Sequence, residues 1–402
     1  MKNKLIPVLF FTIGWSFPTN EVGINLTSKP VFQLDYPFPT ADKPQSKLWY
    51  SENCWWALLP RSTGPSLWQR TEEGWNEYPE VADKLKGISG RADVWAEEHQ
   101  VTVVCVADSS LTVCRLMKNS GPMVKWESKV LAQLNPPTPS SIETATIAKD
   151  GKGNWWVAAT TGLKVCAWFS EDGNNWEAPL VLGQGIDEDD ICSVTTVKDG
   201  IGVIWSDQVR DALLMRKHKN GSPREVWEKE EIIDIGNNTA DDHINTSLSP
   251  DQTLWIATKN SVDTPGKPQF VLRVRSANEK WTNKGYCALE SRMNRPSRPI
   301  VIASEDNSTV LTGYGNNDRS VPYPYNATIV FSSIDLSFNV TDPQVVIFPD
   351  PELKSFVQNV TGPKFPFPVN GPWIVLASDS KGRVYEADLR DFSKIQNKKA
   401  ND

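Results

Sequence analysis

The feature that most constrains the fold is an aromatic residue that recurs about every 50 residues. In each case it follows a polar turn and precedes a short strand-like segment, at Trp75, Trp126, Trp176, Trp227, Trp281 and Phe338. The successive spacings are 51, 50, 51, 54 and 57 residues. A repeat of this length is typical of chains built from similar units, each of which buries a face against its neighbour. The sequence therefore predicts a repeat protein.

A second repeated pattern lies in phase with the aromatic residues. Segments such as "ATIAKDGKGNWWVAAT" and "SVTTVKDGIGVIWSDQ" combine a strand-like run, a turn that contains aspartate, and a second apolar run. Short alternating strands with such turns favour antiparallel sheet, and one four-stranded sheet per repeat around an axis is a β-propeller. We predict an all-β chain with a single seven-bladed propeller, with six blades or a pair of sandwiches as alternatives. The blades are expected near residues 46–82, 90–130, 140–183, 188–235, 240–290, 295–346 and 357–390.

The N-terminal sequence predicts export. "MKNKLIPVLFFTIGW" has a basic start and an apolar run too short to span a bilayer, as in a signal peptide. An N-terminal apolar strand is the alternative. The repeated aromatic residues are expected to pack between neighbouring blades, because one blade cannot bury both of its faces. We assign a signal peptide to residues 1–19, an N-terminal extension to 20–45, the propeller to 46–392 and a polar tail to 393–402.

Composition limits the partners. The chain has 42 Lys and Arg residues against 49 Asp and Glu residues, a net charge of −7, and no basic block alternates with aromatic residues. Nucleic acids and anionic membranes are therefore not expected partners. No later run is long and apolar enough for a membrane helix. We expect a secreted monomer.

The cysteines and sequons also fit export. Cys105 and Cys114 flank "VADSSLTV", a hairpin-like turn, and we predict a disulfide between them, with two reduced core thiols as the alternative. No Cys-x-x-Cys pair is present, which argues against structural zinc. Eight N-x-[ST] sequons occur, of which Asn220 is the weakest because Pro223 follows its serine. Glycosylation is predicted at Asn25, Asn237, Asn307, Asn326, Asn339 and Asn359.

Two stretches resemble known propellers. "SEDGNNW", Ser170 to Trp176, resembles the Asp-box of the sialidase-like (BNR) repeat class, a folding turn in which Asp172 accepts backbone N–H bonds and Trp176 packs inward. Residues 143–305, with "ADDHINTSLSPDQTLWIATK" as the most specific part, are similar to a group of secreted bacterial propellers of poorly defined function. This resemblance implies a propeller outside the cell and carries over no catalytic residues. The chain lacks the Arg-Ile-Pro motif that sialidases share, so sialidase activity is not expected.

The loops that enter the innermost strands predict a charged site. In a propeller these strands line the central channel, and their entry loops surround one mouth. The entry segments here are "SGRADV", "SIETATI", "DEDDICS", "TADDHIN" and "RPSRPIV". Ligand sites prefer such concave mouths with a few convergent polar groups. The sequence therefore predicts a ring of Arg91, Asp93, Glu143, Asp189, Asp190, Asp241, Asp242, His243 and Arg298.

Three interpretations of this ring remain open. In the first, Asp190 and Asp242 cap turns, and His243 is a buried imidazole with satisfied partners. In the second, the carboxylates and His243 shift each other's pKa and act as acid and base. In the third, Asp190, Asp242 and His243 bind Ca²⁺ or another divalent ion. Apart from this ion no cofactor is expected.

A secreted, acidic, Trp-rich propeller with a charged mouth is expected to handle carbohydrate, by analogy at the level of the fold. Glycoside hydrolysis would use Asp190 and Asp242, whereas elimination by a polysaccharide lyase would use His243 as the base. A non-catalytic glycan- or protein-binding propeller is the alternative, and a flat or blocked channel would favour it. The expected catalytic residues are Asp190, Asp242 and His243, and the expected substrate-binding residues are Arg91, Glu143, Asp189, Asp241, Arg298 and Tyr314.

Overall fold

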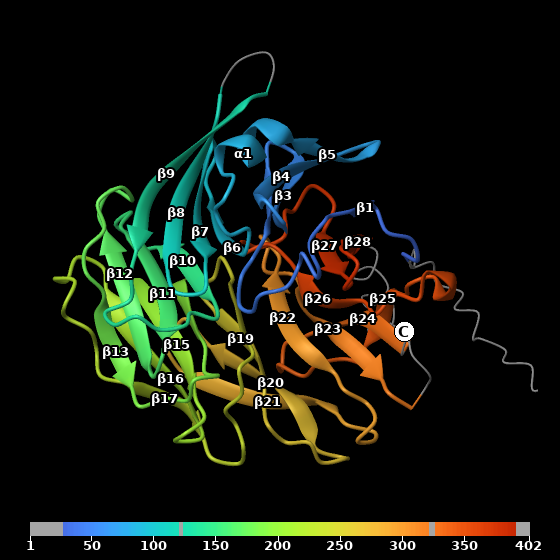
Figure 1. The fold of residues 1–402 in the computed structure, drawn as a ribbon. Coiled ribbons are helices and arrows are strands. Elements are labelled where there is room, and N and C mark those ends of the chain that lie inside the picture. Colours follow the sequence, from blue (N-terminus) through green and yellow to red (C-terminus); the bar gives the residue numbers. More distant parts are fainter. Residues whose placement is uncertain (1–26, 120–123, 321–325, 391–402) are drawn as a thin grey trace, which may run out of the picture.

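The computed structural model describes residues 27–119, 124–320 and 326–390. Within these ranges the chain forms seven antiparallel sheets of four strands each. The sheets follow one another around a ring in the order of the sequence (Figure 1). This is the seven-bladed β-propeller that the aromatic repeat predicts, and the observed blades begin and end within a few residues of the expected positions.

Blades 1 to 6 each consist of four consecutive strands that lie side by side in sequence order. Blades 1 to 3 contain β2 (Leu48–Ser51), β3 (Cys54–Arg61), β4 (Gly64–Thr71), β5 (Gly74–Tyr78), β6 (Ala92–Ala96), β7 (Gln100–Val106), β8 (Leu111–Lys118), β9 (Trp126–Leu134), β10 (Ala145–Lys149), β11 (Trp155–Thr161), β12 (Lys164–Ser170) and β13 (Leu180–Gln184). Blades 4 to 6 contain β14 (Cys192–Val197), β15 (Gly200–Asp207), β16 (Ala212–Lys219), β17 (Glu231–Ile235), β18 (Ile244–Leu248), β19 (Leu254–Lys259), β20 (Pro268–Arg275), β21 (Trp281–Ala288), β22 (Ser297–Ala303), β23 (Val310–Asp318), β24 (Asn326–Ser333) and β25 (Gln344–Ile347).

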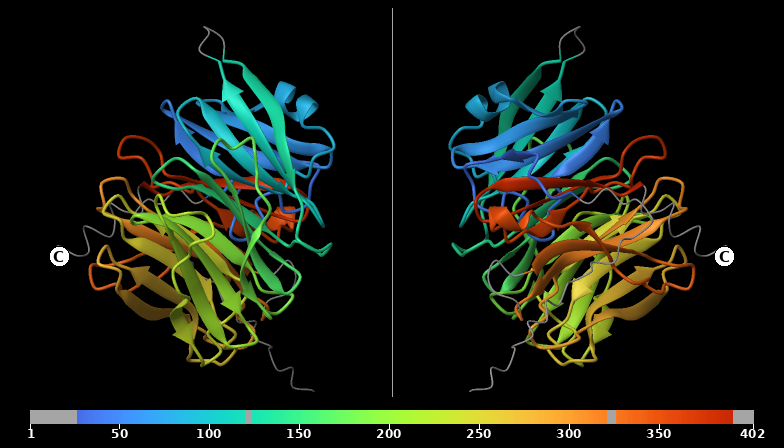
Figure 2. Two further views of the ribbon diagram at one scale, coloured as in Figure 1. Left: turned by 90° about the vertical axis from the view of Figure 1, so that its left-hand side faces the viewer. Right: turned by 90° about the vertical axis from the view of Figure 1, so that its right-hand side faces the viewer.

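Blade 7 joins the two ends of the described chain. It contains β26 (Gln358–Thr361), β27 (Ile374–Ser378) and β28 (Arg383–Asp388), and β1 (Phe32–Gln33) pairs with β28 as its fourth strand. The side views show this blade next to blade 1 (Figure 2). The assignment of residues 20–45 to an extension outside the propeller is therefore wrong for β1. β1 covers the outer edge of β28, so the N-terminal segment completes the last blade and closes the ring.

Helical structure within the described ranges is limited to α1 (Pro79–Lys84) and the 3-10 turn η1 (Pro351–Leu353). α1 begins with proline, which fits a first helical turn because it has no N–H group to leave unpaired. Its Val81 is buried in the cluster that blades 1 and 2 share. Neither segment is long and apolar enough to cross a membrane.

The repeated aromatic residues pack against the preceding blade, as predicted. Trp126 of blade 2 meets Trp56 of blade 1 with ring centroids 5.1 Å apart, and Trp227 of blade 4 meets Trp156 of blade 3 at 5.3 Å. Both pairs have the edge-on geometry that aromatic rings favour. The repeat thus marks the interfaces between blades. Phe338 makes a similar edge-on ring contact with Trp255 of the preceding blade. Trp75 and Trp281 instead donate hydrogen bonds from their indole N–H groups to Glu386 and Glu231 of the preceding blade.

The turn between β12 and β13 has the local geometry expected from its sequence. Oδ1 of Asp172 accepts the backbone N–H groups of Asn175 and Asn174, both at 2.8 Å. These bonds favour the ionised carboxylate and lower the pKa of Asp172. Trp176 packs on the hydrophobic cluster of blades 2 and 3. The turn therefore stabilises the outer part of blade 3 and presents no reactive group.

The predicted disulfide is not formed. Cys105 on β7 and Cys114 on β8 are free, fully buried thiols. Cys105 lies opposite Thr112, and Cys114 lies opposite Val103, so the two cysteines are diagonal and not directly paired in the sheet. The neighbouring Cys114 thiol and burial raise the pKa of Cys105. The alternative of two reduced core thiols holds.

The predicted glycosylation sites differ in exposure. Asn237, Asn307 and Asn339 are exposed, as a glycan requires. Asn359 is only 3% exposed, so the prediction of a glycan there is wrong for the folded chain. Asn326 is the first residue of β24. The predicted signal peptide, Asn25 and residues 393–402 lie outside the described residues.

Candidate active site at the entry of the channel

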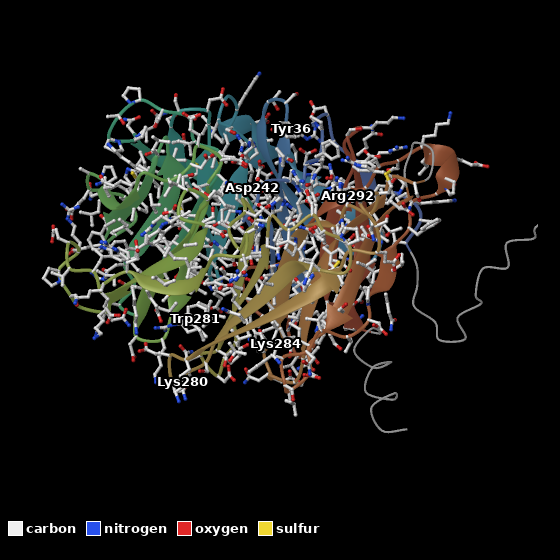
Figure 3. The ribbon with its side chains drawn as sticks, turned by 90° about the horizontal axis from the view of Figure 1, so that it is seen from below. Tyr36, Asp242, Lys280, Trp281, Lys284 and Arg292 are labelled. Carbon is white, nitrogen blue, oxygen red and sulfur yellow. The ribbon has the colours of Figure 1, made fainter. Side chains whose placement is uncertain are left out.

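The first strands of blades 2 to 6 bring most of the predicted site together. β6, β10, β14, β18 and β22 begin at one mouth of the channel, and the site residues lie at or just before these starts. Asp242 lies near the middle of the molecule, whereas Lys280 and Trp281 lie at its margin (Figure 3). Arg91, Glu143, Asp189, Asp241, Asp242, His243 and Arg298 are called the entry ring below.

The mouth is filled by residues 40–46, here called the entry plug. From this segment the ammonium group of Lys43 donates a hydrogen bond to Oδ2 of Asp242 and lies 3.9 Å from Oε1 of Glu143. One cation therefore bridges the two carboxyl groups. Their side chains remain 20% and 39% exposed, so both face solvent at the mouth.

A second ion-pair network fastens the plug to blade 2. Oδ1 of Asp42 accepts a 2.8 Å hydrogen bond from Nε of Arg91, and its Oδ2 lies 3.6 Å from Nζ of the buried Lys47. Arg91 also donates to the backbone carbonyl of Glu143. The predicted substrate ligand Arg91 is thus engaged in holding the plug.

His243 is held through both of its ring nitrogens. Nδ1 lies 2.6 Å from Oδ1 of Asp241 and 2.6 Å from Oδ1 of Asp242. Nε2 lies 3.1 Å from Oγ of Ser297 at the start of blade 6. Asp241 is held in turn by Nζ of Lys259 at 2.6 Å. Since His243 is only 7% exposed, its main contact is with the carboxylates and with the next blade.

The pKa values of the ring carboxyl groups are shifted in opposite directions. Burial raises the pKa of Glu143. The negative charges of Asp242 and Asp189 raise it further, whereas the positive charge of Lys43 lowers it. Burial and the Asp242 charge likewise raise the pKa of Asp189. At Asp242 the effect of burial is outweighed by His243 and Lys43, which hold its pKa well below the usual range. The ring therefore places a carboxyl that is easily protonated beside one that stays ionised.

Arg298 is a ring cation without a partner. Its side chain forms no hydrogen bond or ion pair with any of the residues that the structure describes, and its Nε is buried. Burial lowers its pKa, whereas the negative charges of Asp242, Asp42 and Glu143 raise it. Its backbone has φ 59°, a left-handed conformation that is uncommon for a residue with a long side chain. A half-buried guanidinium without a bonded partner is free to bind an anion, so Arg298 is a candidate ligand for one.

Three predicted residues do not belong to the ring. Asp93 is fully buried and pairs with Lys364, so it is not available at the mouth. Asp190 is fully buried, and its Oδ2 accepts the backbone N–H groups of Asp187 at 2.8 Å and Gln208 at 3.0 Å. It caps the entry turn of blade 4, so its predicted catalytic role is wrong. Tyr314 lies in the middle of β23, and its ring packs on Phe270 at 4.9 Å in the core of blades 5 and 6. It is not available at the mouth, and its predicted role in substrate binding is also wrong.

The acidic residues before blade 5 do not fit a calcium site. One ligand atom from each of Asp241, Asp242 and His243 lies within 4.8 Å of the others. However, Ca²⁺ takes roughly six to eight oxygen ligands, and the ammonium groups of Lys259 and Lys43 already neutralise the two carboxylates. The predicted ligand Asp190 is engaged elsewhere, as described above. Calcium therefore does not fit these residues, and binding of another divalent ion stays a prediction.

Several residues that complete the entry ring were not predicted from the sequence. Asp42 and Lys43 lie outside every repeat, and no motif marks them. Ser297 directly precedes Arg298 in the entry segment "RPSRPIV", so its position at the mouth was readable from the repeat. Lys259 ends β19, the strand next to β18, and its reach to Asp241 depends on the pairing of these strands.

Comparisons with known proteins give only distant likenesses. No known protein family and no curated protein matches the chain. Similar solved structures include a protein from Lactobacillus plantarum, at 12% identity and a TM-score of 0.49 over 76% of this chain and 85% of that one. The α-L-arabinanase of Penicillium chrysogenum complexed with arabinobiose has 12% identity and a TM-score of 0.46 over 79% and 99%. The α-L-arabinofuranosidase of Fusarium graminearum with an iminosugar inhibitor has 9% identity and a TM-score of 0.47 over 79% and 98%. Likenesses this distant assign no activity to the chain.

Proposed function

We propose that the protein is a secreted, carbohydrate-active propeller that hydrolyses glycosidic bonds of a polysaccharide at the entry ring. One observation carries the proposal: Glu143 and Asp242 lie beside a single ammonium group, and their pKa values are shifted in opposite directions. Glycoside hydrolysis uses such a pair, a protonated carboxyl as the acid and an ionised carboxylate as the base or nucleophile. Secretion is supported by the N-terminal sequence and the exposed sequons.

In the proposed reaction Glu143 donates its proton to the glycosidic oxygen, and the carboxylate of Asp242 activates water or attacks the sugar. His243 keeps Asp242 ionised through its hydrogen bond and charge. Positive charge develops on the sugar ring in the transition state, at the place where the ammonium of Lys43 now lies between the carboxyl groups. Lys43 therefore has to withdraw when substrate binds, and its flexible four-carbon stem allows this.

The unpartnered guanidinium of Arg298 favours an acidic polysaccharide. A uronic acid carboxylate would provide the two-pronged acceptor that matches a guanidinium group. Elimination at that uronic acid is less well supported, because both nitrogens of its expected base, His243, are engaged. Its expected acid, Tyr314, lies in the core.

The test is the product spectrum of neutral and uronic-acid polysaccharides incubated with the mature protein. Wild type should release fragments that carry one added water, detected by mass spectrometry. Glu143→Gln and Asp242→Asn should lower the initial rate by roughly 10²–10⁴-fold, the usual contribution of a general acid or base. Glu188→Gln, an exposed carboxylate on the same face, is the control and should leave the rate unchanged. Fragments without added water would instead identify a lyase.

A non-catalytic glycan-binding propeller is the second candidate, and the entry plug favours it. The plug fills the mouth, and the cavity it shares with His243 and Arg298 has a volume of only about 30 Å³, the share of one water molecule. The hydrolase would be contradicted if wild type leaves every polysaccharide of the panel intact. Equal binding of these polysaccharides by wild type and Glu143→Gln would then identify the binding function.

A further inference from the structure

A larger cavity lies at the other end of the central channel. Its volume is about 350 Å³, and its wall includes Thr146 of β10, Thr195 of β14 and Thr246 of β18. These residues lie further along the same first strands whose starts form the entry ring. Pro44 of the entry plug lines both this cavity and the small cavity beside His243. The plug therefore separates the two ends, and we call the larger space the far cavity.

One side of the far cavity is aromatic. Trp95 and Phe365 both line it and are only partly buried. Their ring centroids lie 4.9 Å apart in an edge-on arrangement, and Trp95 also meets Trp155 at 6.4 Å. These contacts fix the indole in place, so that a ligand would meet a rigid apolar surface. A rigid aromatic wall costs little conformational entropy when a ligand binds.

The opposite lining is polar and not fully satisfied. The hydroxyl groups of Ser193 and Thr246 line the far cavity and have no hydrogen-bond partner among the residues that the structure describes. At its rim, Oε1 of Glu97 lies 2.6 Å from Nζ of Lys149. Neither oxygen is among the fully buried unsatisfied atoms, so both face the open space of the cavity and can bond to a ligand there.

The charged groups around the far cavity are all engaged within the protein. Glu97 is paired with Lys149, and Lys364 is paired with the fully buried Asp93. Asp150, which also lines the cavity, pairs with no cation among the described residues, but its carboxylate accepts N–H groups of Lys152, Asn154 and Trp156. A charged ligand would therefore find no counter-charge that is free to receive it. The combination of an aromatic wall, free hydroxyls and paired charges suits a neutral ligand that carries both C–H faces and hydroxyl groups.

We propose that the far cavity binds one or two residues of a neutral saccharide. Its volume lies in the lower part of the roughly 300–1,000 Å³ range of small-molecule sites, which have mostly apolar linings with a few placed polar groups. An apolar face of the sugar packs on Trp95, and its hydroxyls bond to Ser193 and Thr246. This site is independent of the hydrolysis proposed at the entry ring, because no residue is shared between Glu143, Asp242 and the far cavity.

The experiment is a titration of the mature protein, labelled with 5-fluorotryptophan, with a panel of neutral mono- and disaccharides. The ¹⁹F resonance that is lost in Trp95→Phe identifies Trp95, and the saccharide should shift it in wild type. Thr246→Val, which keeps the side-chain shape, and Ser193→Ala should each weaken binding by roughly two- to tenfold, the range expected for one hydrogen bond. Thr282→Val, on the outer strand of the same blade, is the matched control and should bind like wild type.

Two outcomes would overturn the proposal. In the first, no neutral saccharide shifts the Trp95 resonance at millimolar concentration. In the second, a saccharide binds, but Thr246→Val and Ser193→Ala bind it as tightly as Thr282→Val does. Hydrolysis by wild type is measured separately, with Glu143→Gln as the inactive variant. A failure to bind saccharide at the far cavity therefore does not contradict hydrolysis at the entry ring. Likewise, an absence of hydrolysis does not contradict saccharide binding at the far cavity.

Discussion

The two ends of the central channel satisfy their polar groups in different ways. At the entry ring, the chain itself supplies the counter-charges: Lys43 and Asp42 of the plug pair with Asp242, Glu143 and Arg91. At the far cavity, the charged groups are engaged with neighbouring residues, and the hydroxyls of Ser193 and Thr246 are left free among the described residues. A ligand at the entry ring therefore has to displace part of the protein. A ligand at the far cavity breaks none of the ion pairs of the plug.

The entry ring is therefore suited to acid-base chemistry, and the far cavity is suited to recognition of a ligand by its shape. Close charges shift each other's pKa, which acid-base catalysis requires, but they also attract a competing cation. An aromatic wall with paired charges selects a ligand by its surface. The contrast explains why the proposed reaction and the proposed neutral-sugar site lie at opposite ends.

The largest effect is expected where the two ends are joined. Asp93 is fully buried and accepts the backbone N–H groups of Ser46 in the plug at 2.7 Å and Ile147 at 2.8 Å, and it also pairs with Lys364. Asp93→Ala leaves a buried ammonium unpaired, so it should lower the free energy of unfolding by roughly 3–5 kcal/mol. Urea denaturation measures the loss.

The control for this prediction is Asp108→Ala, an exposed aspartate, which should change stability by less than roughly 0.5 kcal/mol. Combining Asp93→Ala with Lys364→Met removes the unpaired charge and should recover part of the loss. If Asp93→Ala is as stable as the control, the buried network does not hold the two ends together.

A stabilising effect is expected at Arg298. Arg298→Asn removes a half-buried cation without a bonded partner and places at φ 59° a residue that tolerates the left-handed conformation. The variant should be more stable by roughly 1–2 kcal/mol, and it should lose affinity for uronic-acid polysaccharides but not for neutral saccharides. Chemical denaturation and the two binding assays test both parts. Arg319→Asn, at an exposed arginine, should change neither. A less stable Arg298→Asn would mean that the guanidinium has a partner in solution.

The sequence predicted the fold well because the fold is periodic. The aromatic residues recur at each interface between blades, so their spacing reports the size of a blade before any strand is assigned. The same periodicity places Glu143, Asp242 and Arg298 at equivalent entry positions. For this reason, it predicts that they meet at one mouth.

The errors lie where the periodic pattern gives no information. Lys43 precedes the first repeat, and the sequence alone does not show that its segment folds back into the channel. Tyr314 was predicted to bind substrate, and it is followed by glycine and asparagine, which are common in turns. In the structure Gly315 and Asn316 continue β23 and pair with β24, which puts Tyr314 in the core. Pairing with a neighbouring strand overrides the local preference.

The pH dependence of the proposed hydrolysis tests the role of the plug. Activity requires protonated Glu143 and ionised Asp242, so it should fall as pH rises through the pKa of Glu143 and as pH falls through that of Asp242. Lys43 lowers both pKa values. Lys43→Met should therefore raise both and move the whole profile to higher pH, measured as initial rate against pH. Lys86→Met, at an exposed lysine, should leave the profile in place. If the pH profile of Lys43→Met is the same as that of wild type, Lys43 does not contact the carboxyl groups in solution.

The smallest effect on stability is expected at the rim of the far cavity. Glu97 and Lys149 form a partly exposed pair, and such pairs contribute roughly 0–1 kcal/mol. Glu97→Gln should thus scarcely change the urea midpoint. It also leaves Lys149 without a counter-charge beside the cavity. Neutral saccharides should bind about as before, and acidic saccharides should gain affinity for the far cavity, seen as a new shift of the Trp95 resonance. If acidic saccharides already shift that resonance in wild type, pairing of charges does not set the selectivity of this end.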